Sequence, residues 1–381
     1  MSSDYNYNLL KKDIKEGKQI VLFVGAGINF CPKHRMLWSD VMRHLFKHAL
    51  TSIACNKDIN KDDLAQLKEL FGIDNNALLD KESINSYLEL HEYVQDEYPS
   101  VLQAYIVKRI LGQRYISIIQ EFLYKNCSTV LLREAFETNH SIKPKEKKKE
   151  IDYPCLYAIA RLILLCPNIK AVVTYNYDNF LTQAIKILQE SPGSYFNNED
   201  KLLFNKRTNN GALEVVDVYG DNYNSVIKSK TFPIYHVHGY IPSPTEIQSI
   251  DETSIVLSLD EFYDNVRNVY SWQTDTQMHL LSHYTCVFIG SSISDITIQR
   301  MLYYAQHYGN NENIYYFRAH QIKQKLNEHH KCIHKILDEI KNDFYNDYGL
   351  TTIYREDGYD KLYPYISALV DVLKTEENEE V

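Results

Sequence analysis

The feature that most constrains this chain is the alternation of short apolar strands with helices of ordinary length after residue 150. We predict helices at 155–166 and 179–189. The expected strands are 19–24, 170–174, 233–238, 254–258, 285–289, 313–317 and 351–354. Strands that alternate with helices form a parallel sheet with helices on both faces. The sequence therefore predicts an α/β fold with a doubly wound, mainly parallel sheet.

A long helical segment interrupts this pattern after the first strand. Apolar residues recur at helical spacing from 36 to about 136, and no convincing strand lies among them. We expect a sheet domain made of 1–35 and 151–375, with 36–150 as a large helical insert ending in a charged, solvated loop at 142–150. The tyrosine-rich insert suits a surface for oligomers or partners and suits internal packing equally well. Residues 376–381 form an acidic tail.

Composition excludes several classes of protein. The formal charge of −9 disfavours direct binding of nucleic acid, whose phosphates attract the opposite sign. No signal peptide precedes the first helix, and no apolar run approaches the roughly 20 residues of a membrane span. The seven cysteines are scattered without any CxxC pair, so we expect reduced thiols, a cytoplasmic protein, no zinc module and no metal.

Four polar motifs follow strands, at the sheet edge where ligands bind in open parallel sheets. The first contains Gly25, Ala26, Gly27 and Asn29, and its glycines allow the backbone to approach a phosphate. A tight turn without a ligand explains the same residues. Phe30 stands where a dehydrogenase fingerprint requires glycine.

The second motif places Asn176 and Asp178 just past an apolar strand, on one side at period two. An amide there can orient a ribose hydroxyl or a water molecule, and a carboxylate can fix a neighbouring loop. Asp178 or Asn179 could instead cap the next helix. Capping explains one of these residues but does not explain Asn176.

The third motif holds His236 and His238, which we expect to point to the same side of the strand at 233–238, with Gly239 ending that strand. A histidine at a strand end suits a general base, because its ordinary pKa lies near neutrality. His236 is expected to satisfy a core hydrogen bond. The pair also has metal-ligand spacing, but no nearby acidic or histidine cluster completes a site.

The fourth motif is Gly290, Ser291, Ser292 and Asp295, which follow the strand at 285–289. Its glycine and serines suit contacts to a ribose or a pyrophosphate. For Asp295, or alternatively Ser294, capping of the helix that starts near Thr297 is an equally good explanation.

In this order the four motifs resemble the sirtuin family, whose fold is Rossmann-like. The family's Gly-Ala-Gly-Ile-Ser loop is similar to the segment from Gly25 to Asn29, and its Gln-Asn-Ile-Asp motif to 175–178. Its His-Gly pair and its Gly-Thr/Ser-Ser turn resemble 238–239 and 290–292. The resemblance implies catalytic roles for Asn176 and His238. It implies NAD contacts for Gly25, Ala26, Gly27, Asn29, Asp178, Gly290, Ser291, Ser292 and Asp295, with Arg35 in place of a cofactor-loop arginine.

Two departures from sirtuin deacylases refine the resemblance. The four-cysteine zinc module has no counterpart, since no cysteine lies between Cys166 and Cys286, and the helical insert is foreign to deacylases. Both features, with Trp38-Ser39-Asp40 and the segment 257–263, resemble bacterial sirtuin-like antiphage proteins that hydrolyse NAD. The resemblance implies NAD as substrate, a homo-oligomer and a HerA-type hexameric ATPase partner. The alternatives are an NAD- or ADP-ribose-binding module without activity, a protein deacylase, and a metal-dependent hydrolase at the two histidines.

Overall fold

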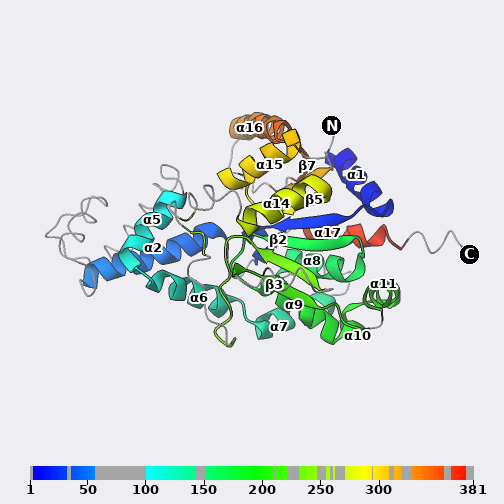
Figure 1. Ribbon diagram of the computed structural model, residues 1–381, viewed down its shortest axis with the longest axis horizontal. Coiled ribbons are helices and arrows are strands. Elements are labelled where there is room, and N and C mark those ends of the chain that lie inside the picture. Colours follow the sequence, from blue (N-terminus) through cyan, green and yellow to red (C-terminus); the bar gives the residue numbers. More distant parts are fainter. Residues whose placement is uncertain are drawn as a thin grey trace, which may run out of the picture.

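A computed structural model describes residues 3–31, 36–55, 100–141, 152–209, 211–220, 223, 231–246, 255–257, 261, 271–293, 295–308, 313–319, 328–355 and 362–374. These residues form a seven-stranded sheet in which every neighbouring pair is parallel, in the order β3-β4-β2-β1-β5-β6-β7 (Figure 1). The strands are β1 Ile20–Val24, β2 Ile169–Thr174, β3 Val215–Val218, β4 Phe232–His236, β5 Thr285–Ile289, β6 Ile314–Ala319 and β7 Leu350–Arg355. The predicted Rossmann-like α/β class is confirmed.

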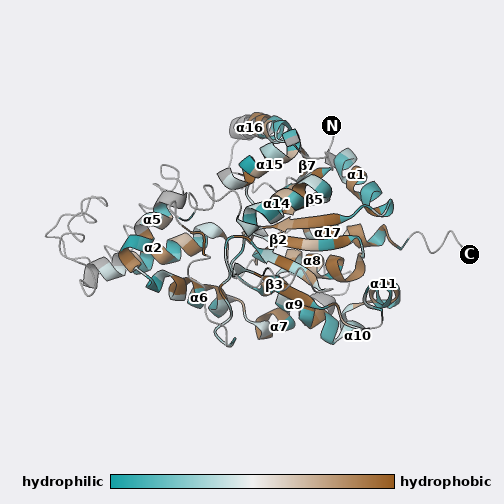
Figure 2. Cartoon of the chain, viewed as in Figure 1, coloured by the Kyte–Doolittle hydropathy of each residue, from teal (hydrophilic) through white to brown (hydrophobic). Residues whose placement is uncertain are grey.

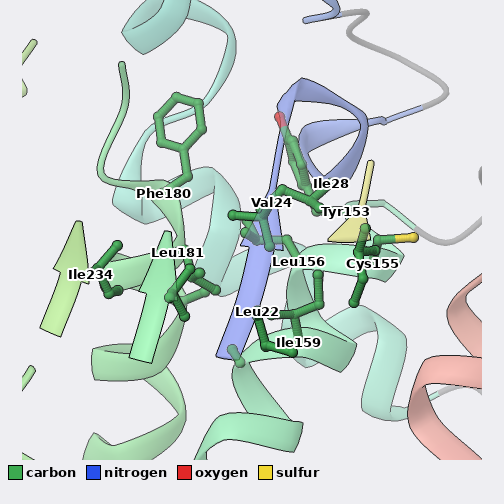
Figure 3. Packing of buried hydrophobic residues seen from close by; sticks show 14 of the residues in the cluster. Leu22, Val24, Ile28, Tyr153, Cys155, Leu156, Ile159, Phe180, Leu181 and Ile234 are labelled. Atoms are coloured by element: carbon green, nitrogen blue, oxygen red, sulfur yellow. The ribbon is translucent and has the colours of Figure 1, made fainter. Parts of the chain in front are cut away.

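Helices cover both faces of the sheet (Figure 1). One face packs α1 Ser3–Lys15, α8 Pro154–Leu165, α9 Phe180–Glu190 and α17 Leu362–Asp371, and the other packs α14 Trp272–His283, α15 Ile296–Tyr308 and α16 Glu328–Asp347. Strand β1 is buried along its whole length, as a central parallel strand requires. Its Leu22 and Val24 join the first core cluster, beside Leu156 and Ile159 of α8 (Figure 3), whereas Phe23 stacks on Phe288 in the second, with ring centroids 4.6 Å apart.

The distribution of hydropathy follows this layering. Figure 2 shows the strands as the most hydrophobic part of the molecule and the outer helices with hydrophilic surfaces. Burial of one such large apolar side chain stabilises a fold by about 1.5–3 kcal/mol. The sandwich of helix, sheet and helix therefore buries the central strands, and the edge strand β3 stays half-buried.

The order of the strands fixes where a ligand can bind. Strands β2, β4 and β3 lie in that spatial order on one side of the central β1, and β5, β6 and β7 lie on its other side. The crossovers change faces at the same point, because α8 and α9 lie in one core cluster and α14 and α15 in the other. Ligands of doubly wound sheets bind beyond the carboxyl ends of the strands at such a switch point. The loops after β1, β2 and β5 all begin at this edge of the sheet, at or beside the switch point.

The described part of the predicted insert is helical. Its helices are α2 Trp38–Cys55, α5 Ser100–Leu111, α6 Arg114–Asn126 and α7 Thr129–Ser141, and α2, α5 and α6 extend to one side of the sheet in Figure 1. Leu45, Leu132 and Phe136 of these helices are buried in the same core cluster as the sheet. The insert therefore shares its core with the strands, and its exact boundaries stay a prediction.

Two segments differ from the prediction. Of the strand expected at 254–258, residues 255–257 are described and form no strand, because Val256 N donates to the carbonyl of His238 beyond the sheet, at 2.9 Å. Residues 191–223, a polar stretch outside every predicted helix and strand, contain α10 Pro192–Tyr195, α11 Asn198–Thr208 and β3. Helix α11 is largely polar, and β3 contains three valines but is only four residues long and half-buried at the edge of the sheet. The loop at 142–150 and the acidic tail lie outside the described residues.

Candidate functional site

The glycine loops after β1 and β5 pack directly against each other. Gly27 N donates to the carbonyl of Gly290 at 2.8 Å. A Cβ on Gly25 would lie 2.6 Å from the Cα of Ser291, and a Cβ on Gly290 would lie 2.6 Å from Ile28 N. Both positions therefore require glycine because two backbones meet. The first and fourth sequence motifs form one structural unit.

A buried hydrogen bond joins the first motif to the second. Asn29 lies in η1 (Ala26–Asn29), and its Nδ2 donates to Oδ2 of Asp178 at 2.7 Å. The other carboxylate oxygen of Asp178 accepts from Phe180 N at 3.1 Å, which is the predicted capping role at the start of α9. Both oxygens are thus bonded to protein, which favours a positioning role for Asp178 over direct contact with a ligand.

Burial raises the pKa of Asp178 to about 6, although the bonds from Phe180 and Asn29 and the charge of His236 oppose that shift. A carboxyl group with a raised pKa in the folded state adds stability below its unfolded pKa of about 4. That contribution is lost as the pH rises through about 6. The site therefore contains a carboxyl group that is costly to keep ionised.

Replacing Asp178 with asparagine should remove this titration. The asparagine amide introduced at position 178 can donate to Oδ1 of Asn29, which has no protein partner, once the side-chain amide of Asn29 has flipped. We expect the free energy of unfolding of the native protein to fall, relative to that of the variant, by roughly 2–3 kcal/mol between about pH 4 and pH 7. Urea denaturation of both proteins at the two pH values measures the difference, and parallel pH dependence would contradict a raised pKa.

A small polar pocket lies beside these loops, between the ends of β2 and β4. Asn176 lines it, and its side-chain amide has no hydrogen-bond partner among the residues that the structure describes. Its backbone N–H donates to Oγ1 of Thr174 at 3.1 Å. The pocket is lined by Ile28, Thr174, Asn176, Asp178, Asn179, Leu181, Thr182, Asp217, Ile234 and His236. An amide in this position is available to a ligand or to water.

Two further buried atoms in the neighbouring loops lack partners. They are Oδ1 of Asn29 and Oγ of Ser291, both on side chains that are almost fully buried. An unsatisfied buried polar atom costs about 1–3 kcal/mol, and native structures seldom keep one without a reason. Both atoms belong to motifs for which the resemblance to sirtuins implies contacts with NAD.

The two histidines occupy different environments. Strand β4 ends at His236, and Gly239, whose φ is +97°, closes a turn by donating to the carbonyl of His236 at 3.2 Å. His238 thus lies beyond the strand, and the alternation that would align it with His236 does not reach it. The ring of His236 is bonded to Asp217 and to the carbonyl of Asn176, as expected for a core hydrogen bond, whereas His238 packs edge-on against Tyr175 at 5.0 Å.

His238 is half-buried, and this burial lowers its pKa, although the carboxylate of Asp295 opposes the shift. The imidazole is therefore neutral near pH 7 and can accept a proton. Oδ1 of Asp295 accepts from Thr297 N at 2.8 Å, so its predicted capping of α15 is confirmed. Through its charge, Asp295 links the fourth motif to the third.

Sequence reasoning missed a set of residues that support the site. Asn179 Oδ1 accepts from the hydroxyl of Tyr124 in α6 at 3.2 Å, and its Nδ2 donates to Tyr240 at 3.2 Å and to Glu246. The Tyr124 hydroxyl also donates to the carbonyl of Ile241. Helix α6 of the insert therefore holds the residue after Asp178 in place through a hydrogen bond. In the sequence, only its position next to Asp178 pointed to a role for Asn179, and nothing pointed to a role for Tyr124.

Other predicted residues are placed as follows. Ala26 is half-buried and Ser292 is exposed in its loop, whereas Arg35 lies outside the described residues. Trp38 packs against Tyr177 of the second motif, with ring centroids 6.2 Å apart. No group of three or more His, Cys, Asp or Glu within the described ranges could hold a metal ion. The cysteines with described side chains are buried free thiols.

Comparison with known families agrees with this geometry. Residues 170–353 match the family model of the SIR2-like domain. This part of the chain is thus similar to SIR2-like domains. The match runs from β2 to β7, so it includes Asn176, His238 and the loop after β5. It supports a sirtuin-like family and NAD-related activity in general.

No curated protein matches the chain. Among the helices that the structure describes, none is long and apolar enough to cross a membrane.

Proposed function

We propose that the protein is an NAD glycohydrolase that cleaves NAD to nicotinamide and ADP-ribose or its cyclic form. The observation that supports this most directly is the unpartnered amide of Asn176, which lines a pocket between the ends of β2 and β4, beside the switch point of the sheet. An amide so placed can orient a ribose hydroxyl or an attacking water. The SIR2-like domain supports NAD as the ligand, as SIR2-like domains bind NAD.

The buried atoms without partners fit a dinucleotide. Oδ1 of Asn29 can accept a hydrogen bond from a ribose hydroxyl, and the hydroxyl of Ser291 can donate to a phosphate oxygen. Each bond would recover part of the cost of burying an unsatisfied polar atom. The residues present are therefore suited to hydroxyl and phosphate groups.

The reaction makes modest demands on the site. Cleavage of the bond between nicotinamide and ribose releases a neutral base from a cationic ring, so little acid catalysis is needed. In this proposal Asn176 holds the ribose or the water in a reactive pose. His238 accepts the proton that water loses as its oxygen bonds to the ribose carbon and the electron pair of the broken bond leaves with nicotinamide.

We further propose that NAD depletion is an antiphage, abortive-infection response in the cytoplasm. This part rests on the resemblance carried by Trp38-Ser39-Asp40, the insert and the missing zinc cysteines. An unregulated NADase would harm its host, which favours control by assembly in a homo-oligomer and with a HerA-type hexameric ATPase. Nicotinamide release measured with and without such an ATPase tests the control, and a rate unchanged by any candidate partner would count against it.

Replacing Asn176 with alanine should reduce nicotinamide release by at least about 10²-fold, since positioning of reactants supplies effects of that size. Release from NAD by the purified proteins is the measurement. Asn6→Ala is a matched control, because Asn6 is also buried and also leaves an oxygen without a partner, but it bonds to the carbonyl of Thr352 far along the chain. Binding of NAD by the native protein without release would identify a non-catalytic module instead.

A further inference from the structure

A chain of buried hydrogen bonds connects the sheet edge to Asn176. Thr182 Oγ1 donates to Oδ1 of Asp217 at 2.6 Å, and Nε2 of His236 lies 2.9 Å from that same oxygen. The other ring nitrogen, Nδ1, lies 3.2 Å from the carbonyl oxygen of Asn176. The four residues come from α9, β3, β4 and the loop after β2, so the chain of bonds ties four elements together.

The ring of His236 lies between two hydrogen-bond acceptors. Its Nε2 faces a carboxylate oxygen of Asp217, and its Nδ1 faces the backbone carbonyl of Asn176. Only 1% of the side chain of His236 is exposed, whereas Asp217 lies on the edge strand β3 and is partly open to solvent. Asp217 thus orients a buried ring whose other nitrogen faces the carbonyl of Asn176.

The backbone of Asn176 depends on these side chains because β2 ends at Thr174. The N–H of Asn176 donates to Oγ1 of Thr174, and its carbonyl accepts from His236. Side chains therefore replace the sheet's own hydrogen bonds at this residue and leave its amide free to face the pocket. Loss of the His236 bond would let the peptide after Asn176 rotate and move that amide.

We propose that His236 is a positioning residue that holds the amide of Asn176 in its reactive pose, and that Asp217 orients His236 for this task. The proposal rests on the proposed NAD glycohydrolase function. His236 acts through Asn176, so the proposal predicts a loss in kcat with little change in KM for NAD. A displacement of about 1 Å at a reacting group can cost as much as 10²-fold in rate.

Two substitutions separate the two nitrogens. The side-chain nitrogen of asparagine falls near the position of Nδ1, and that of glutamine falls near Nε2. His236→Asn can keep the bond to the Asn176 carbonyl and lose Asp217, whereas His236→Gln can keep Asp217 and lose Asn176. Both remove the ring, so each is the matched control for the other. We expect kcat to fall about 10- to 100-fold in the glutamine variant and to stay within a few-fold in the asparagine variant.

Hydrogen–deuterium exchange of the peptide spanning 174–179 provides a readout that does not depend on activity. The proposal predicts faster exchange in His236→Gln than in His236→Asn. Equal exchange and equal kcat in the two variants would overturn it, as would a larger loss in the asparagine variant. If the native protein releases no nicotinamide while exchange still separates the variants, the glycohydrolase proposal fails and the positioning role stands.

Should His236→Gln fail to fold, Thr174→Val gives a second test. It removes the acceptor for the N–H of Asn176 and keeps the size of the side chain. The expected result is the same loss in kcat with an unchanged KM. A normal kcat in that variant would show that the backbone tethers of Asn176 do not set the position of its amide, and this would overturn the proposal.

Discussion

Replacing His238 with alanine is expected to lower kcat for nicotinamide release by about 10²- to 10⁴-fold, the range of a single positioned general base. The ring is half-buried against Tyr175, and no metal-binding group of described residues includes it. We expect the fold to persist and NAD binding, measured by calorimetry, to change little. Unchanged nicotinamide release in this variant would remove His238 from the mechanism.

The pH profile supplies the check on this assignment. Because the pKa of His238 is lowered, the rate should hold as the pH falls from neutrality to the ordinary histidine value and should decline only below it. Asp295→Asn removes the charge that opposes this shift and keeps a good helix cap, so its decline should begin at still lower pH. His283→Ala is the control, since His283 is exposed and bonds only to the carbonyl of His279 among the described contacts.

Replacing Gly290 with alanine should destabilise the protein by roughly 2–5 kcal/mol, a large part of the 5–15 kcal/mol typical of a domain. The residue has a φ of +67°, which alanine disfavours, and the new Cβ would lie 2.6 Å from the backbone of Ile28. A backbone atom cannot rotate away as a side chain can. The loops after β1 and β5 would separate, and nicotinamide release should be lost with them.

Two other glycines isolate the effect of the close approach. Gly112 and Gly349 also have positive φ, but a Cβ would meet nothing within 4 Å at the first and only the side chain of Gln306, at 3.5 Å, at the second. Alanine at these positions should cost only the conformational strain, about 1–2 kcal/mol. Urea denaturation of the three variants measures the difference. Equal losses would mean that contact between the loops adds nothing.

Much of the fold could be predicted from local sequence. The run from Ile20 to Val24 is apolar on both faces, and a segment of that kind is a central parallel strand in an α/β protein. The glycines and polar residues that follow β1, β2 and β5 are also local signals. Because parallel strands bring their carboxyl ends to one edge, their appearance at the site followed from the fold class.

Tertiary structure decided how these residues are used. The bond between Asn29 and Asp178 spans 149 positions, and the bond between Tyr124 and Asn179 joins the insert to the sheet. Spacing cannot encode such contacts, because they depend on how distant segments pack. Strand β3 was missed because its four residues, three of them valine, form too short a segment to stand out in a polar stretch.

The two histidines show which properties of the site the sequence determined and which the tertiary structure decided. The sequence alone predicted a histidine at the end of one strand and Asn176 just after another, and the topology of the sheet made those two strands neighbours. Only the tertiary structure decided that β4 ends at His236, that Asp217 from the edge strand receives its ring, and that His238 turns toward Tyr175. Strand propensity is a local property of the chain, whereas the direction of a side chain after a strand depends on hydrogen bonds that only neighbouring strands provide.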